Sequence, residues 1–325
     1  MNFSKDIKKI ILSTEKINFE ECAFRIYEYQ YQYCEVFQQF VNLVGKQPAK
    51  ISTLSDCAFL PIEFFKTKEL ISTQASDYKI FTSSGTTGTT TSQHFVSDTH
   101  FYDSLSVQLF EAQYGALNQY RVCALLPSYL EREGSSLVWM ASHFIEATKA
   151  NGSAFYLHNH DELVKVLQDK RPTLLLGVTF ALLDLIEQYE LDLSHCIVME
   201  TGGMKGRRKE MLREELHLKL TQSLSVQSIH SEYGMTELLS QAYSKGEGIF
   251  EASKSMRVFL RETADPFTIN NQLRYGAVNV VDLANVDSCS FIATQDLGKF
   301  VADNQFEIIG RMDNADVRGC NLMLT

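Results

Sequence analysis

The chain has 325 residues, 45% of them hydrophobic, and its 30 Lys and Arg against 40 Asp and Glu give a formal charge of −10 at pH 7. This composition is typical of a globular protein and excludes a disordered chain or a miniature scaffold. The acidic balance, without a cluster of Lys and Arg, lacks the positive surface expected of a protein that binds nucleic acid or an anionic membrane.

The N-terminus carries charges every few residues and has no continuous apolar stretch, so no secretory signal is expected. The most apolar run, residues 173–183, contains Gly177 and is shorter than the roughly 20 residues that span a bilayer. We therefore expect a cytoplasmic protein without membrane insertion. Its seven cysteines form no C-x-x-C pair, which indicates neither a disulfide framework nor a zinc site.

The first expected elements are helices. Residues 18–44 lack Pro and Gly and repeat apolar positions every three or four residues. From Tyr78 onward, short apolar runs alternate with amphipathic stretches. One of these stretches predicts a helix behind the N-cap candidate Ser97, with Phe101, Leu105 and Leu109 on one face. Other helices are predicted at 161–168 and 207–220, and strands at 79–84, 121–127, 153–157, 173–178, 195–201 and 224–230.

Strand and helix alternating in this way predict an α/β fold, with a doubly wound, mostly parallel sheet and helices on both faces. After Gly246 the runs GAVNVVDL, SFIAT and FEIIG predict the shorter strands of a mixed β subdomain. The expected domains are an N-terminal helical segment at 1–77, an α/β nucleotide-binding core at 78–245 and the mixed β subdomain at 246–325.

The most informative segment follows the predicted strand at 79–84. Eleven consecutive Ser, Thr and Gly residues occupy positions 82–92, whereas ordinary connections are about 4 to 6 residues long. Small residues let the backbone approach an anion, and many N–H and O–H groups then converge on it, as a phosphate site requires. The segment is not a Walker A loop, because no Lys follows the second Gly at the required spacing. The alternative is a polar turn without a ligand.

A second candidate is the segment 230–237, HSEYGMTE, placed at the end of a predicted strand, where open α/β sheets bind ligands. Glu237 is a candidate ligand for Mg²⁺, which is usually held by one or two carboxylates and phosphate oxygens. Taken alone, this carboxylate would be a solvated residue at a helix start. His230 is the one histidine expected near a reacting carboxylate.

Four motifs in order resemble those of the adenylate-forming superfamily, which includes acyl-CoA synthetases and firefly luciferase. They are SSGTTG at 83–88, EYGMTE at 232–237, TQDLG at 294–298 and GRMD at 310–313. Within that superfamily the chain most resembles the acyl-protein synthetases, the fatty-acid-activating component of the bacterial luminescence fatty acid reductase. The segments that carry this second resemblance lie at 60–66, 127–140, 201–211 and 312–324.

The resemblance implies ATP and Mg²⁺ as cofactors and gives the motif residues their roles. The β and γ phosphates would lie on the first motif, Tyr233 would pack against adenine, and Thr236 would lie near the α-phosphate with Glu237 and the metal. Asp296 and Arg311 would hold the ribose hydroxyls. The full set of expected nucleotide-binding residues is Thr82, Ser83, Ser84, Gly85, Thr86, Thr87, Gly88, Gly203, Glu232, Tyr233, Gly234, Met235, Thr236, Asp296 and Arg311.

The sequence departs from the superfamily at two points. The phosphate loop lacks the usual lysine, and no C-terminal lid domain with its catalytic lysine is expected, since the hinge motif lies just before Thr325. The missing positive charge must come from elsewhere, and Lys205 is the preferred candidate, ahead of Arg207 and Arg208.

The family reaction implied is activation of a fatty acid to an acyl adenylate, followed by acyl transfer to the enzyme's own C-terminal cysteine, here Cys320. Arg318, two residues away, would favour its thiolate. An acyl-accepting reductase, acyltransferase or carrier protein is the implied partner. Three alternatives stay open: a ligase that uses coenzyme A or a carrier thiol, an acyltransferase that loads Cys320 without ATP, and a binding protein without catalytic activity.

Overall fold

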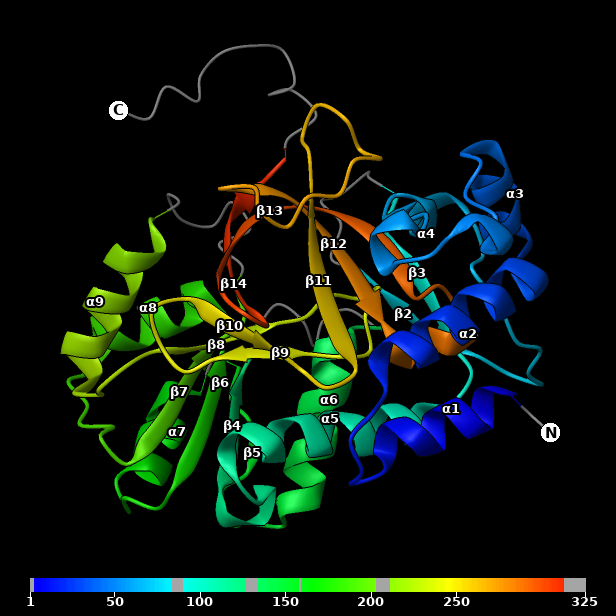
Figure 1. Cartoon of the computed structure of the whole chain (residues 1–325). Coiled ribbons are helices and arrows are strands. Elements are labelled where there is room, and N and C mark those ends of the chain that lie inside the picture. Colours follow the sequence, from blue (N-terminus) through cyan, green and yellow to red (C-terminus); the bar gives the residue numbers. More distant parts are fainter. Residues whose placement is uncertain (1–2, 84–89, 127–133, 158, 203–210, 313–325) are drawn as a thin grey trace.

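The computed structural model describes residues 3–83, 90–126, 134–157, 159–202 and 211–312. Figure 1 shows its helices packed around strands that run through the middle of the molecule. The helices are α1 (Phe3–Leu12), α2 (Phe19–Tyr33), α3 (Glu35–Leu43), α4 (Phe64–Thr67), α5 (Thr99–Tyr114), α6 (Ser136–Thr148), α7 (His160–Leu167), α8 (Thr179–Gln188) and α9 (Arg213–Leu224). Short 3₁₀ turns lie at Pro48–Lys50, Leu54–Asp56, Leu117–Gln119 and Leu283–Asp287.

Within the described residues, twelve of the strands form one sheet in the order β11-β12-β13-β14-β10-β9-β8-β7-β6-β4-β5, with β1 added beside β13. The strands are β1 (Leu60–Pro61), β2 (Lys79–Thr82), β3 (Gln93–Val96), β4 (Arg121–Leu125), β5 (Ala154–Phe155), β6 (Thr173–Gly177), β7 (Cys196–Glu200), β8 (His230–Tyr233), β9 (Ala242–Ser244), β10 (Ile249–Ala252), β11 (Met256–Arg261), β12 (Gly276–Asp282), β13 (Phe291–Ala302) and β14 (Gln305–Arg311).

The sheet has a parallel half and an antiparallel half. Strands β5, β4, β6, β7 and β8 are parallel neighbours, and β9 to β14 continue the sheet with antiparallel pairs. All five residues of β6 are buried, because helices cover both faces of a parallel sheet. The predicted α/β class is confirmed. Strand pairing passes without interruption across residue 245, and the domain boundaries drawn there from sequence stay predictions.

The predicted strand at 79–84 forms, as β2, but outside the large sheet. It pairs antiparallel with β3, from Lys79 opposite Val96 to Thr82 opposite Gln93. Thr82, which ends β2, and Gln93, which begins β3, therefore lie side by side at one end of a two-stranded ribbon.

Two further expectations need correction. The strand predicted at 224–230 lies later, at His230–Tyr233, because Leu224 continues the buried stripe of α9 and Ser225, at φ 55°, ends that helix in the left-handed conformation. The cap of α5 is Asp98, whose side chain accepts from the Phe101 amide; Ser97 donates instead to Asp287. Helix α1, which was not predicted, buries Ile7 and Ile11 on one face.

The helices fall into groups around the sheet (Figure 1). Helices α1, α2 and α3 gather beside β12 and β13, whereas α8 and α9 lie beside β7 and β8. Among the described residues, no helix is long and apolar enough to cross a membrane.

Candidate active site

A cavity of about 970 Å³ lies where the two halves of the sheet meet. Strands β7 and β8 end at it, and β13 and β14 close its far side. Its volume is at the upper end of the range for small-molecule sites. Ligands bind at this edge of open α/β sheets, because loops of different strands converge there.

The base of the predicted phosphate loop forms one wall of the cavity. The Ser83 amide donates to the Ser92 carbonyl at 3.1 Å, and the Ser92 amide donates to the Ser83 hydroxyl oxygen at 2.9 Å. This pair closes the loop, and Ser83 and Thr90 both line the cavity. The expected phosphate-binding residues Ser84, Gly85, Thr86, Thr87 and Gly88 lie outside the described residues.

The second motif forms the floor of the cavity. Glu232 and Tyr233 end β8, and the chain turns through residues 234–237, which also line the cavity. A Cβ atom at Gly234 would lie 2.1 Å from Oε1 of Glu232, so a larger residue here would force the Glu232 carboxyl group to move. Burial raises the pKa of Glu237, and a hydrogen bond from Ser92 opposes that rise. The motif and the phosphate loop are therefore in direct contact.

Asp296 joins the second and third motifs. Tyr233 Oη donates to Asp296 Oδ2 at 2.9 Å, and Arg311 Nε lies 3.4 Å from Asp296 Oδ1. Asp296 and Arg311 are register partners across β13 and β14, which explains why two residues 15 positions apart meet. Burial raises the pKa of Asp296, whereas Tyr233 and Arg311 work against that rise. The carboxylate is thus held at a fixed edge position beside an aromatic ring.

A pair of carboxyl groups distinguishes the middle of the cavity. Burial, together with the nearby Glu200 carboxylate, raises the pKa of Glu232 to about 7. Glu200 itself accepts hydrogen bonds from the Gly202 amide at 2.6 Å and from the Ser231 hydroxyl at 2.9 Å. Glu232 therefore carries a proton in part of the molecules at neutral pH, while Glu200 anchors the strand ends on either side.

Glu237 is the one predicted metal ligand. Within the described part of the chain, no group of three or more His, Cys, Asp or Glu side chains is placed to hold a metal ion. Glu237 lines the cavity as a single carboxylate beside Ser92, and this arrangement fits Mg²⁺, which keeps most of its ligands as water and phosphate oxygens.

One predicted site residue among those that the structure describes, His230, is not brought to the cavity. His230 is not among its lining residues; it lies at the start of β8, where its Nδ1 is 3.2 Å from Tyr114 Oη. Burial and then the Lys245 charge lower its pKa to about 4. Gly203, Lys205 and Cys320 lie outside the described residues. Gly202 and Met211, on either side of 203–210, both line the cavity.

Sequence patterns missed three residues at or beside the site. Lys66 and Arg213 line the cavity, and His94 binds the Thr236 carbonyl from β3. Lys66 lies in the segment 60–66 that the family resemblance covers, but no local sequence pattern marks it as a residue of the site. Only the pairing of β1 with β13 brings it to the site.

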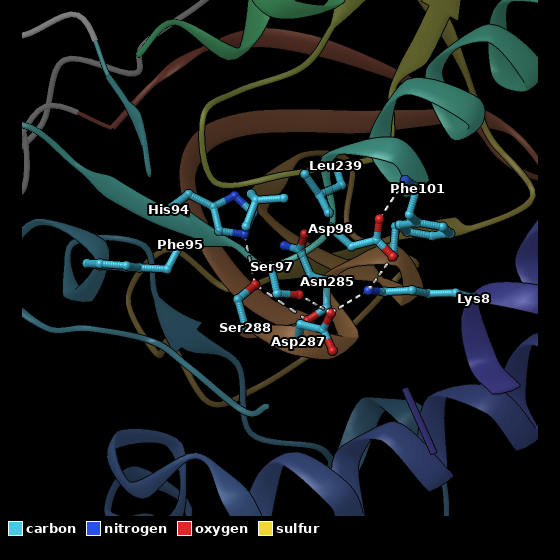
Figure 2. A pocket seen from close by; sticks show the side chains of 12 residues that line it. Lys8, His94, Phe95, Ser97, Asp98, Phe101, Leu239, Asn285, Asp287 and Ser288 are labelled. Atoms are coloured by element: carbon cyan, nitrogen blue, oxygen red, sulfur yellow. Dashed lines mark hydrogen bonds and ion pairs between the residues drawn. The ribbon is translucent and has the colours of Figure 1, made fainter. Parts of the chain in front are cut away.

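A mostly buried polar cluster lies near His94 (Figure 2). Lys8 forms ion pairs with Asp98 and Asp287, and Ser4 and Ser97 also donate to Asp287. Figure 2 shows Asp287 at the centre of these contacts. The space inside the cluster is about 10 Å³, too small for any ligand larger than one water molecule. The cluster therefore fastens α1 to the start of α5 and to the 3₁₀ turn between β12 and β13.

No protein-family model matches the sequence, and no curated protein matches it. Solved structures do. The chain is similar to 2-hydroxyisobutyryl-CoA ligase in an open conformation with 2-HIB-AMP and CoA (10% identity, TM-score 0.69, 90% of this chain and 74% of that one). It is also similar to ATP-bound MatB from Rhodopseudomonas palustris (18%, 0.52, 74% and 49%). A third similar structure is the long-chain-fatty-acid-CoA ligase FadD1 from Archaeoglobus fulgidus (14%, 0.52, 71% and 51%).

This chain spans about half the length of the MatB and FadD1 structures. At these identities the similarity establishes the fold, which is that of the acyl-CoA ligases. The fold class expected from the sequence is thereby confirmed.

Proposed function

We propose that this protein activates a carboxylic acid, by preference a fatty acid, with ATP to an acyl adenylate and passes the acyl group to a thiol. The observation that carries the proposal is the convergence of Ser83, the 232–237 turn and the Asp296–Arg311 pair on one cavity. The outermost of these residues, Ser83 and Arg311, lie 228 positions apart in the sequence, and a turn without a ligand would not require the groups to meet.

Each group has a place in this reaction. Tyr233 packs against adenine, and Asp296 with Arg311 binds the ribose hydroxyls, since a fixed carboxylate can accept from two neighbouring hydroxyls. Thr236 lies by the α-phosphate, and Ser83 with residues 84–87 donates to the β and γ phosphates. Glu237 would hold Mg²⁺, and the bound metal would supply positive charge at the phosphate oxygens.

The bonds change in two steps. A carboxylate oxygen of the acid attacks the α-phosphorus; the bond from that phosphorus to the bridging oxygen breaks, and pyrophosphate leaves with the electron pair. A thiolate then attacks the acyl carbon, a thioester forms, and AMP leaves. The protein contributes position and hydrogen-bond donors where charge develops on the leaving group, and supplies no nucleophile in the first step.

We propose Cys320 as the favoured thiol, as in the acyl-protein synthetases that the sequence resembles, with a reductase, acyltransferase or carrier protein receiving the acyl group later. Coenzyme A is the second candidate acceptor. It is favoured by one observation, that the similar 2-hydroxyisobutyryl-CoA ligase was solved with CoA bound.

The test is ATP–pyrophosphate exchange driven by a panel of acids of different chain length and aromaticity. Exchange that depends on one class of acid supports the proposal and names the substrate. Binding of ATP without exchange for any acid would favour the non-catalytic alternative, and acylation from acyl-CoA without ATP would favour the acyltransferase.

A further inference from the structure

The phosphate loop of this chain contains no lysine, so the negative charge of a bound triphosphate needs a cation from another element. Among the described residues that line the cavity, three carry a positive charge: Lys66, Arg213 and Arg311. The three side chains differ in the hydrogen bonds and ion pairs that they form in this structure.

Two of the three are already engaged. Arg311 pairs with Asp296 at 3.4 Å. Arg213 donates from Nη1 to the Ile308 carbonyl at 2.9 Å, and its guanidinium lies over the Phe250 ring at 5.6 Å from the centroid. Both arginines therefore serve to hold walls of the cavity together.

Lys66 differs, because its ammonium forms no hydrogen bond or ion pair with any described residue. It is exposed, yet it lines the cavity together with Ser83, Thr90 and Ser92, the described residues at the base of the phosphate loop. Lys66 also interacts electrostatically with Glu237 of the second motif. Burial raises the pKa of Glu237, and the positive charges of Arg311 and Lys66 oppose that rise.

The backbone that carries Lys66 is fixed on three sides. The Ile62 amide donates to the Ala293 carbonyl of β13 at 3.0 Å, and the Gln295 side chain donates to Glu63. Phe65 is buried and packs edge-on against His94, with ring centroids 5.6 Å apart. The short helix α4 is thus bound both to the strand of Asp296 and to the hairpin of the phosphate loop, with Lys66 at the cavity.

We propose that Lys66, rather than the Lys205 preferred from sequence alone, is the phosphate-binding cation of this site, taking the place of the absent loop lysine by contacting the β and γ phosphates of ATP and the pyrophosphate that leaves. The assignment rests on the proposed function. A lysine suits this role as a compact charge that neutralises phosphate oxygens without the fixed geometry of an arginine. Lys66 lies on α4, outside the phosphate loop, so the presence of its charge at the site does not depend on the loop sequence.

The test compares Lys66→Ala with Lys68→Ala, an exposed lysine two positions along that does not line the cavity. Titration calorimetry of each full-length variant with ATP, and separately with AMP, measures binding without turnover. We expect Lys66→Ala to raise the Kd for ATP about 10- to 100-fold, the usual loss for a hydrogen bond to a charged group. The Kd for AMP should not change, because AMP has neither of the phosphates concerned. Lys68→Ala should match the wild type, and Lys66→Arg should recover most of the ATP affinity.

Three outcomes contradict the assignment, and they are distinguishable. If the wild type binds ATP and Lys66→Ala binds it within twofold as tightly, Lys66 is not the cation, while the proposed function stands. An equal loss of ATP and AMP affinity would indicate damage to the site and would also reject a specific role at the β and γ phosphates. If the wild type binds no ATP, the proposed function fails and this assignment fails with it.

Discussion

The Nδ1 atom of His94 lies 2.8 Å from the backbone carbonyl oxygen of Thr236, so the hairpin of the phosphate loop is tied directly to the second motif. A carbonyl only accepts, so Nδ1 must carry the proton. Nε2 then accepts from the Ser288 hydroxyl, also at 2.8 Å (Figure 2). The ring is fully buried and uses both nitrogens, which fixes it as the neutral tautomer.

This environment predicts how the stability depends on pH. Burial lowers the pKa of His94 to about 4 from its ordinary value near 6.5. As the pH falls from about 6.5 to about 4, His94 becomes protonated in the unfolded chain but stays neutral in the folded chain, so the free energy of unfolding decreases. Between pH 7 and pH 5, His94 should account for a loss of about 2 kcal/mol.

Urea unfolding of the wild type and of His94→Gln at several pH values measures this contribution. The variant will be less stable at pH 7, since it loses ring packing, but its stability should decrease less toward pH 5. His100→Gln, at an exposed position of α5, is the control and should follow the wild type. Parallel curves for His94→Gln and the wild type would show that His94 does not titrate in this range.

Asp296 should govern binding of the nucleotide rather than of the acid. Its carboxylate is held by Tyr233 and Arg311 and faces the cavity, where the ribose hydroxyls are proposed to bind. We expect Asp296→Ala to raise the KM for ATP about tenfold or more, as when a hydrogen bond to a charged group is lost, and to leave the KM for the acid unchanged. Exchange kinetics with each substrate varied in turn measure both constants. Asp303→Ala, in the exposed turn before β14, is the matched control. If Asp296→Ala instead raised only the KM for the acid, Asp296 would belong to the acyl pocket.

Glu237→Gln tests the metal ligand. The amide keeps the shape of the side chain and can still accept from Ser92, so the fold should be retained, but the anionic oxygen that binds Mg²⁺ is lost. Pyrophosphate exchange should fall to near background at every Mg²⁺ concentration, while thermal unfolding changes little. Glu247→Gln, an exposed substitution in the turn between β9 and β10, should behave like the wild type. A normal Mg²⁺ titration of Glu237→Gln would reduce Glu237 to a structural residue of the turn.

Local patterns were sufficient to predict the parts of the fold that depend on near neighbours in sequence. The strands around Leu174 and Val198 and the motif at 232–237 have their own signals, in apolar runs and in turn residues. The place of β8 was not predictable, because Leu224 is as apolar in the buried stripe of α9 as it would be in a strand.

The contributions of Lys66 and His94 to the site were not predictable either. Each depends on a contact over a long stretch of chain: β1 with β13 for Lys66, and β3 with the Thr236 turn for His94. Neither residue belongs to a pattern with a fixed spacing. Sequence motifs therefore located the groups proposed to touch the nucleotide, whereas the side chains that hold or complete them appeared only with the fold.

Cys320→Ser tests which thiol receives the acyl group. An acyl adenylate is reactive enough to acylate a thiolate, and Cys320 lies in the C-terminal segment that the family resemblance covers. The wild type incubated with ATP and a labelled acid should hold about one hydroxylamine-labile acyl group per chain, because a single cysteine is proposed as acceptor. Cys320→Ser should keep acid-dependent pyrophosphate exchange and lose the label, whereas Cys289→Ser, a buried cysteine of the core, should keep the label. Label found on added coenzyme A would instead identify a ligase that uses a soluble thiol. Label retained by Cys320→Ser would identify another residue of the protein as the acceptor. Pyrophosphate exchange alone cannot distinguish these cases, because it requires no acceptor.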